Sequence, residues 1–329
     1  MKRIFLGLLA ATALSFSAYA QDIKPALLYD LGGKFDKSFN EAAFNGAEKF
    51  KSETGIEYVE FEVSNASQRE QALRRFAEDG RNPIVMTGFA WAEALDKVAT
   101  DFPDTQFAII DMVVDKPNIR SVVFKEQEGS YLVGLLAGMA SQSKKVGFVG
   151  GMDIPLIRRF GCGYVGGAKA GGATEVIQNM TGDTPAAWND PTKGGEIAKT
   201  QIDQGADVIY AAAGGTGVGV LQAAADAGKL GVGVDSNQNG LHPGKVLTSM
   251  LKRVDTAVHG AFMDAKDGKL KGGINDLGLK EGGVDYAVDE NNKDLITPEM
   301  KAAADKAKAD IIAGTVTVHD YMSDDTCPY

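Results

Sequence analysis

Between Asp30 and Glu41 the sequence carries the residues best suited to hold a small flat molecule. Asp30 ends an apolar run, so its carboxylate either accepts hydrogen bonds from a ligand or caps the turn that follows. Ser38-Phe39-Asn40-Glu41 has the spacing of a capping box, in which Ser38 accepts from the Glu41 amide and the Glu41 carboxylate accepts from the Ser38 amide. Phe39 is then either the first core residue of a helix or a stacking platform. Asn40 offers donors and an acceptor to the edge of a heterocycle.

A second glycine-rich stretch lies at the first turn of a predicted βαβ unit at residues 206–235. Gly214-Gly215-Thr216-Gly217-Val218-Gly219 imitates a dinucleotide-binding turn, and Asp235 lies 20 residues beyond Gly215. The match is imperfect because Val220 occupies the third glycine position, but Gly215 is still predicted to contact the ligand. Asp235 at the carboxyl end of a strand can hold a sugar diol with two hydrogen bonds, or it can cap a turn.

Four further residues are predicted to reach a ligand. Trp188 lies in a loop after a strand, where its ring either completes an aromatic sandwich or packs on the rim. Lys252 follows a strand and either donates to sugar hydroxyls or is solvated. Asp111 and Gly88 also follow strands, and their assignment rests on topology alone.

Signatures of catalysis are not found in the sequence. His242, His259 and His319 lack metal-ligand spacing, and Cys162 lacks the context of a nucleophile. A Gly-x-Ser-x-Gly elbow and a Walker-type phosphate loop are also missing. We therefore predict no catalytic residue, no metal and no cofactor. A nucleoside hydrolase or an NAD-dependent enzyme is the less favoured alternative.

Short β-rich runs alternate with amphipathic runs of helical period, which predicts two successive βα series and parallel sheets. In the first series strands are expected at 26–29, 56–63, 83–86 and 107–111, with helices at 38–53, 68–78 and 92–102. In the second series strands are expected at 146–149, 175–178, 207–210 and 231–234, with helices at 157–170, 193–204 and 218–227. The remainder supplies a strand at 246–251, a helix at 254–267, a β-like run at 284–288 and a helix at 298–313.

This order of elements predicts an α/β protein with two lobes, each a parallel sheet flanked by helices. Residues 21–125 and about 253–282 are expected to form the first lobe, and residues 126–252 and about 283–329 the second. The C-terminal remainder is too short for a third domain and most simply crosses between the lobes. Because open α/β sheets bind ligands at the carboxyl ends of their strands, the ligand cleft is expected between the lobes.

The net charge and the N-terminal residues limit the classes of protein to which this chain can belong. Acidic residues outnumber basic ones by 44 to 34, and the net charge of −10 argues against a nucleic-acid partner. Lys2 and Arg3 precede an apolar stretch at 4–18, and Ala18-Tyr19-Ala20 fits a cleavage site, so residues 1–20 are expected to be a removed signal peptide. No cysteine lies near the cleavage site. We therefore expect a monomeric periplasmic protein without a lipid anchor.

The two cysteines, Cys162 and Cys327, leave two interpretations open. In an oxidising compartment they can pair and tie the C-terminal tail to the middle of the chain. Alternatively, Cys162 is a buried free thiol and the tail is loose. The geometry that decides between them is not given by the sequence.

Asp30-Leu31-Gly32-Gly33 followed by Asp36-Lys37-Ser38-Phe39-Asn40 resembles the opening motif of the basic membrane protein family, the purine-nucleoside-binding lipoproteins of bacterial ABC importers. Later motifs are similar and stand in the same order: Val146-Gly147-Phe148-Val149-Gly150-Gly151, Ala213-Gly214-Gly215-Thr216-Gly217, Gly233-Val234-Asp235-Ser236 and Ser249-Met250-Leu251-Lys252-Arg253. The resemblance spans nearly the whole mature chain and implies a type I periplasmic-binding-protein fold. Two departures are the missing lipid-accepting cysteine and Asn237, which stands where an Asp is expected.

Residues and resemblance together predict a periplasmic substrate-binding protein that delivers a purine nucleoside to the membrane permease of an ABC importer. Adenosine, guanosine and inosine are the expected ligands, with the free nucleobase as a variant. The base is expected to bind against Phe39, and closure of the lobes to bring up Trp188, Asp235 and Lys252. A sugar or signal-molecule receptor of the same fold is the alternative, because a fold does not fix its ligand.

Overall fold

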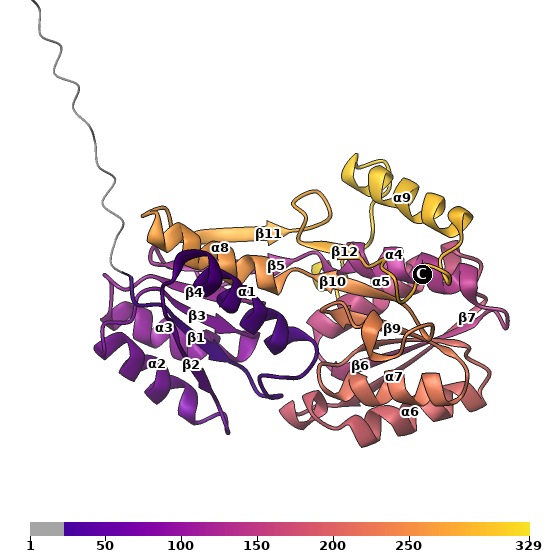
Figure 1. Ribbon diagram of the computed structural model, residues 1–329, viewed down its shortest axis with the longest axis horizontal. Coiled ribbons are helices and arrows are strands. Elements are labelled where there is room, and N and C mark those ends of the chain that lie inside the picture. Colours follow the sequence, from indigo (N-terminus) through magenta and orange to yellow (C-terminus); the bar gives the residue numbers. More distant parts are fainter. Residues whose placement is uncertain (1–22) are drawn as a thin grey trace, which may run out of the picture.

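The computed structural model describes residues 23–329, so the expected signal peptide and its cleavage site lie outside the described residues. Within this part of the chain two six-stranded sheets lie side by side, each with helices on both faces (Figure 1). The predicted α/β class with two lobes is confirmed. None of the helices of residues 23–329 combines the length and the apolar character needed to cross a bilayer.

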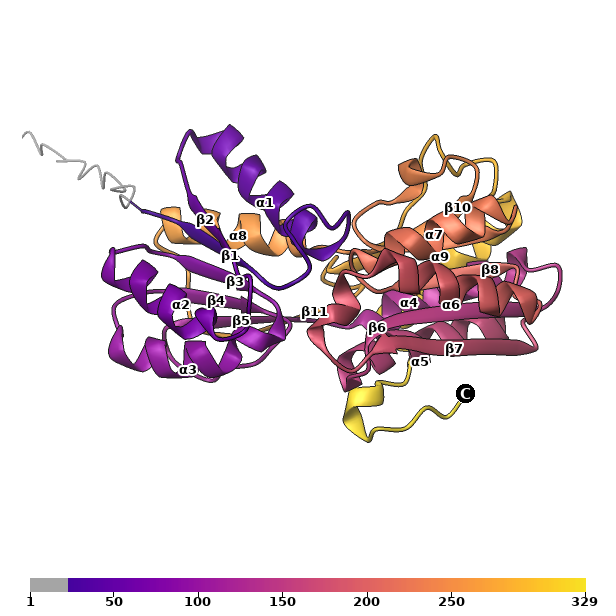
Figure 2. The same cartoon turned by 90° about the horizontal axis from the view of Figure 1, so that it is seen from below.

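The first sheet has the strand order β11-β5-β4-β3-β1-β2, and all of its pairs are parallel. Its strands are β1 (Ala26–Tyr29), β2 (Val59–Glu62), β3 (Ile84–Thr87), β4 (Phe107–Ile110), β5 (Ile119–Phe124) and β11 (Gly273–Leu277). Helices α1 (Phe39–Thr54) and α8 (Val254–Lys266) cover one face, and α2 (Gln68–Glu78) and α3 (Ala92–Asp101) the other (Figure 2). The short helix η1 (Phe89–Trp91) follows β3.

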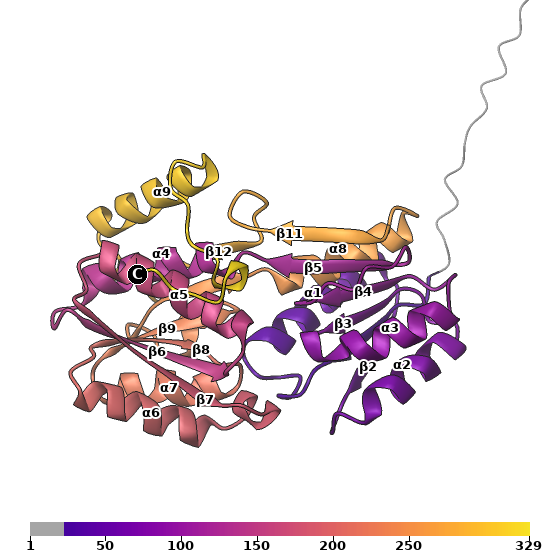
Figure 3. The same ribbon diagram turned by 180° about the vertical axis from the view of Figure 1, so that it is seen from behind.

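The second sheet has the order β12-β10-β9-β8-β6-β7, with β12 antiparallel to β10 at the edge. Its strands are β6 (Lys145–Met152), β7 (Glu175–Gly182), β8 (Val208–Ala212), β9 (Leu230–Asp235), β10 (Val246–Lys252) and β12 (Val284–Tyr286). Helices α4 (Glu126–Ala140) and α5 (Pro155–Ala170) cover one face, and α6 (Pro191–Asp203) and α7 (Thr216–Asp226) the other. Helix α9 (Pro298–Ile312) packs outside α4 (Figure 3), and η2 (Pro185–Trp188), η3 (Asn239–Leu241) and η4 (Tyr321–Ser323) lie in loops.

The chain crosses between the two sheets three times: from β5 to α4, from β10 to α8 and from β11 to β12. These crossings are tied to one another through the backbone. The Lys125 amide donates to the Leu277 carbonyl at 3.1 Å, and the Arg253 amide donates to the Gly283 carbonyl at 2.8 Å. Hinges between lobes are formed by a few loop or element-terminal residues, and these three connections are of that kind. The lobe boundaries given above stay a prediction.

Two strands and one helix were not predicted, and the sequence pattern of each was missed for a different reason. Strand β11 is an edge strand with mostly exposed side chains, so it shows no apolar alternation. Helix α4 is buried on most of its surface, so its apolar residues do not follow one face. Strand β5 does carry an apolar run, but it stands between the two recognised series.

Candidate ligand-binding cleft

A cavity lies where the carboxyl ends of the two sheets face each other, and it contains about 610 Å³ of atom-free space including its mouth. Both lobes contribute to its walls, as expected for this fold. Seven of the predicted ligand-binding residues line it: Asp30, Phe39, Asn40, Asp111, Trp188, Asp235 and Lys252. Gly88 and Gly215 do not line it.

Two aromatic residues reach the cavity from opposite lobes. Phe39 is the first residue of α1, and Trp188 is the last residue of η2; both are half-buried. A Cβ atom on Gly151 would overlap the indole ring, so this glycine in the predicted motif makes room for Trp188. Thr216 fixes the loop, because its hydroxyl donates to the Ala187 carbonyl at 2.7 Å and accepts from the Asp190 amide at 2.7 Å.

Three carboxylates stand at the carboxyl ends of strands at the cavity: Asp30 directly after β1, Asp111 directly after β4 and Asp235 as the last residue of β9. Each keeps one oxygen without a hydrogen-bond partner in the described part of the chain, namely Asp30 Oδ2, Asp111 Oδ1 and Asp235 Oδ1. Asp111 and Asp235 also have φ angles of 72° and 61°. Left-handed backbone is costly for a non-glycine residue, and residues with it cluster at functional sites.

Asp30 is held in place by two donors on one oxygen. Its Oδ1 accepts from the Leu31 amide at 2.8 Å and from Arg69 at 2.6 Å. Gly88 lies beside this carboxylate, with φ 99°, and any Cβ there would collide with it. Gly88 therefore serves the site by leaving space for Asp30, and its direct contact with a ligand stays a prediction.

Lys252 lies at the end of β10 and is almost completely buried. Its ammonium group lies 2.7 Å from Asp111 Oδ2 and 3.0 Å from Glu126 Oε1. The rings of Phe39, Phe124 and Phe160 surround it, with centroids 5.2 to 5.4 Å away. A lysine in such a box of rings and carboxylates stays charged, so the solvated-surface interpretation of Lys252 is wrong.

The pKa values at the cavity follow from one cation shared by several buried carboxylates. Burial raises the pKa of Asp235 to about 6, and attraction to Lys252 limits the rise. Burial likewise raises the pKa of Asp111 against the opposing pull of Lys252. For Lys252 burial favours the neutral amine, but Asp111, Glu126 and Asp235 outweigh it and raise the pKa.

The capping box predicted for residues 38–41 is wrong. Ser38 makes no side-chain cap; its hydroxyl donates instead across the lobes to Asp235 Oδ2. The helix is capped from upstream by Asp36, which accepts from the amides of Ser38, Asn40 and Glu41 at 2.8, 3.0 and 3.1 Å. Asp36 also lines the cavity, and it was missed from the sequence because Ser38 offered a competing cap for the same helix end.

Asn40 lines the cavity, but its polar atoms are used within the first lobe. Its Nδ2 donates to the Asp30 and Gly33 carbonyls, both at 3.1 Å, and its Oδ1 accepts from the Thr87 hydroxyl at 3.1 Å. These bonds fix the turn that carries Asp30. A hydrogen bond from Asn40 to a ligand stays a prediction, and in this state it requires an exchange of partners.

Comparison with known proteins decides the family. The model of a family described as ABC transporter substrate-binding protein, PnrA-like (Bmp), matches residues 23–320. A Lactococcus lactis protein named ABC transporter nucleoside-binding protein BmpA is 35% identical over 322 residues, which cover 90% of this chain and 89% of that protein. This chain belongs to the PnrA-like family of ABC transporter substrate-binding proteins.

Other members agree with this assignment to the PnrA-like family. A Pyrococcus furiosus protein named as a lipoprotein is 35% identical over 300 residues, covering 86% of this chain and 74% of that protein. A crystal structure of solute-binding proteins of an ABC transporter system from Aeropyrum pernix K1 superposes with a TM-score of 0.84 at 31% identity, covering 92% of this chain and 95% of that chain. The predicted resemblance to the basic membrane protein family is confirmed.

In this PnrA-like protein, Gly215 supports the Trp188 loop. A Cβ on Gly215 would lie 3.2 Å from the Trp188 carbonyl, so the residue sits behind the loop and its contact with a ligand stays a prediction.

Glu126 is a second residue that sequence reasoning missed, since one acidic residue at a helix start looks like an ordinary surface charge. In residues 23–329 no group of three or more His, Cys, Asp or Glu side chains is arranged to hold a metal ion.

Proposed function

We propose that this protein is an exported receptor that binds a purine nucleoside in the interlobe cavity and presents it to the permease of an ABC importer. The observation that carries the proposal is the pairing of two aromatic rings with three carboxylates that each keep a free acceptor oxygen. A purine nucleoside offers the matching groups, namely a flat ring, ring or amino N–H donors and sugar hydroxyl donors. The family membership supports a transported solute, and the name of the Lactococcus lactis relative supports a nucleoside.

In the proposed complex the purine lies between Phe39 and Trp188. Stacking of a base on aromatic rings contributes about 1–3 kcal/mol per base. Asp30 Oδ2 then accepts from an N–H on the purine edge, because Arg69 holds the other oxygen and so fixes the direction of the carboxylate. This arrangement favours bases that present a donor, such as adenine, guanine or hypoxanthine.

The pentose lies on the second lobe, against Asp235 and Lys252. Asp235 has one free oxygen, and the other accepts from the Ser38 hydroxyl, which a sugar hydroxyl of the same chemistry can replace. Lys252 Nζ has three N–H groups; Asp111 Oδ2 accepts from one of them, and Glu126 Oε1 lies 3.0 Å away as an ion-pair partner. At least one N–H is therefore left to donate to a sugar oxygen. Two vicinal hydroxyls therefore meet both an acceptor and a donor.

Closure of the lobes on the ligand is supported by contacts that join the two sides. Ser236 Oγ donates to the Ser38 carbonyl at 2.8 Å, and Gln238 Nε2 donates to the Lys37 carbonyl at 2.9 Å. We propose that the permease recognises this closed form. We also propose that the mature protein is monomeric and free in the periplasm; because relatives are named as lipoproteins, fractionation of cells is needed to test the missing anchor.

Isothermal titration calorimetry of the full mature chain tests the proposal. Adenosine, guanosine or inosine should bind at least about tenfold more tightly than the matching nucleobase, since the sugar adds hydrogen bonds to charged groups. Ribose alone should not bind measurably. Tight binding of pentoses or hexoses without purines would establish the sugar-receptor alternative. Release of free base and ribose during overnight incubation would establish a hydrolase.

A further inference from the structure

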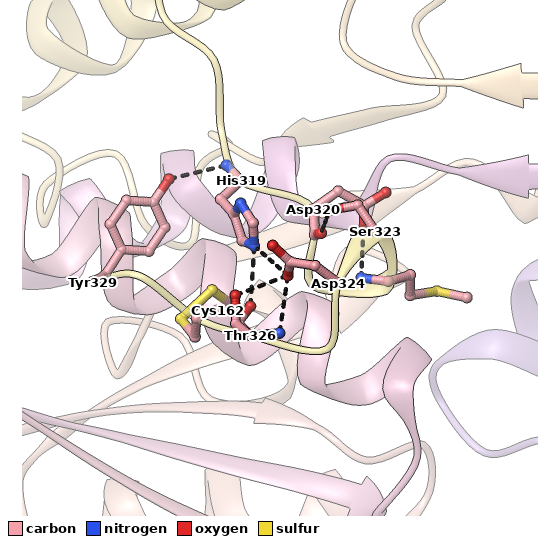
Figure 4. The surroundings of a disulfide bond; sticks show 9 residues. Cys162, His319, Asp320, Ser323, Asp324, Thr326 and Tyr329 are labelled. Atoms are coloured by element: carbon pink, nitrogen blue, oxygen red, sulfur yellow. Dashed lines mark hydrogen bonds and ion pairs between the residues drawn. A yellow bond between two sulfur atoms is a disulfide. The ribbon is translucent and has the colours of Figure 1, made fainter.

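The C-terminal residues 316–329, here called the strap, are fastened to helix α5. A disulfide joins Cys327 to Cys162, with 5.6 Å between the Cα atoms (Figure 4). The Tyr329 hydroxyl accepts from the His319 amide at 3.0 Å, and the Tyr329 ring covers Gly166 so closely that a Cβ there would collide with it. The interpretation of Cys162 as a free thiol with a loose tail is therefore wrong.

Side chains within the strap give it a defined shape. His319 Nε2 lies 3.1 Å from Asp324 Oδ1 and 3.0 Å from the Thr326 carbonyl, and these contacts close a loop around η4 (Figure 4). At the start of that loop Asp320 caps η4 by accepting from the Met322 amide at 2.9 Å. The strap therefore holds the Asp320 carboxylate in one place.

Asp320 binds the guanidinium group of Arg159 through two hydrogen bonds, from Nε at 2.8 Å and from Nη2 at 2.9 Å. The remaining nitrogen, Nη1, donates to the Phe124 carbonyl at 2.8 Å and to Glu126 Oε2 at 3.0 Å. Bidentate pairing fixes the plane of a guanidinium group. The contact with Asp320 therefore fixes the position of Arg159 Nη1.

The contacts continue from Glu126 into the ligand cavity. Glu126 Oε1 pairs with Lys252, and Lys252 pairs with Asp111. Charges thus alternate from the strap to the cavity, while the exposed fraction of the side chains falls from 34% at Asp320 to 13% at Arg159 and 1% at Glu126. Buried charges are costly unless each has its partner, so loss of the outermost partner should disturb the inner ones.

The same contacts lie on the hinge. Phe124 and Glu126 flank the crossing from β5 to α4, and Lys252 ends β10 at the crossing to α8. Arg159 comes from α5 of the second lobe and holds both flanks of the first crossing. The hollow beside the cavity is lined by members of the same set, Asp111, Glu126 and Arg159, together with Met322 of the strap.

We propose that the strap is a positioning element of the binding site: Asp320, held by the Cys162–Cys327 disulfide, orients Arg159 and Glu126, and through them fixes the Lys252 ammonium group and the hinge. Asp320 is thus a positioning residue that touches no ligand. Its effect on sugar recognition rests on the function proposed above. Its effect on the hinge does not, and this difference separates the two claims experimentally.

The test compares Asp320→Asn with Asp320→Glu and with Asp325→Asn. Asp320→Asn removes the charge that Arg159 needs, whereas Asp320→Glu keeps it. Asp325→Asn is the matched control, because Asp325 is an exposed residue of the strap that does not touch Arg159. Calorimetry should show adenosine bound about fivefold more weakly by Asp320→Asn, adenine within about twofold, and wild-type values for Asp320→Glu. Equal losses for adenosine and adenine, or equal losses in the Asp325→Asn control, would overturn the sugar part.

Hydrogen exchange of the protein without ligand tests the hinge part. The Lys125 and Arg253 amides bond across the crossings, so they should exchange about tenfold faster in Asp320→Asn than in Asp325→Asn. The double variant Cys162→Ser/Cys327→Ser should change the same amides in the same direction, since it frees the end of the strap. Unchanged exchange at both amides in Asp320→Asn would overturn the proposal. If wild-type protein binds no nucleoside, the proposed function fails while this measurement still decides the role of the strap.

Discussion

Asp36 and Asp235 face one cavity from opposite lobes, and their surroundings differ in the way that matters for binding. Both are buried, and burial raises the pKa of each to about 6. Both carboxylate oxygens of Asp36 accept hydrogen bonds from backbone amides at the start of α1, three in all. Asp235 accepts from a single hydroxyl, that of Ser38, and keeps one oxygen free. Burial and charge are therefore shared by a structural and a binding carboxylate, and unused acceptor capacity distinguishes them.

The same contrast extends over the two rims of the cavity. In the first lobe, Asn40 and Asp30 are bonded to their own loop and to Arg69, so this rim is rigid before a ligand arrives. In the second lobe, Asp235 and Lys252 bond to residues of the first lobe or the hinge. A hydrogen bond between the lobes can be replaced by a hydrogen bond to the ligand at little cost in free energy, because one bond is lost for each one formed.

Replacement of Asp235 should give the largest effect. Asp235→Ala removes the acceptor proposed for the sugar, and hydrogen bonds to a charged group contribute about 1.5–3 kcal/mol. We expect adenosine affinity to fall about 100-fold, while adenine affinity changes by less than about threefold. Titration calorimetry of both ligands measures the split. Equal losses for base and nucleoside would remove Asp235 from sugar recognition.

Trp188→Ala should come next and should not discriminate between the ligands. The ring is proposed to stack on the base, so adenosine and adenine should both bind about 10- to 30-fold more weakly. Trp91→Phe is a matched control for fluorescence and stability, because Trp91 is fully buried in the core beneath the sheet of the first lobe. Unchanged binding by Trp188→Ala would assign Trp188 to rim packing alone.

Asp36→Ala should lower stability and leave the preference for nucleoside over base unchanged. The cap on three amides of α1 is lost, which costs about 1–2 kcal/mol in the free energy of unfolding. Urea denaturation measures the stability, and calorimetry measures the ratio of the two affinities. A ratio that drops as far as in Asp235→Ala would mean that the two carboxylates share the binding role, and the comparison between them would fail.

The dependence on pH should separate binding from stability by sign. Below about pH 6 Asp235 takes up a proton and loses an acceptor, so adenosine affinity should fall about tenfold between pH 7.5 and pH 5. The folded-state pKa values of Asp36 and Asp235 lie above the ordinary pKa of 3.8 for an Asp carboxyl, so these groups add stability as the pH falls through 6. The melting temperature of the empty protein should therefore not drop in this range. Asp235→Asn should flatten the binding profile.

More of the fold than of the hydrogen bonds at the site could be predicted from the sequence. Alternating β and helical periods gave most elements and the place of the cleft, because both depend on local patterns and on the rule for parallel sheets. The partner of Ser38 could not be predicted, because a hydroxyl at a helix start has a local use and Asp235 lies 197 residues away. The chain from Asp320 to Glu126 is equally long-range. Single charged residues look alike in sequence whether they are exposed or buried.

A crystal structure of the protein with adenosine bound tests the central claim most directly. We expect the purine between the Phe39 and Trp188 rings, with Asp235 and Lys252 on the pentose hydroxyls and the Ser38 hydroxyl displaced from Asp235. A ligand seated elsewhere, or a pentose that points away while Ser38 still binds Asp235, would contradict it.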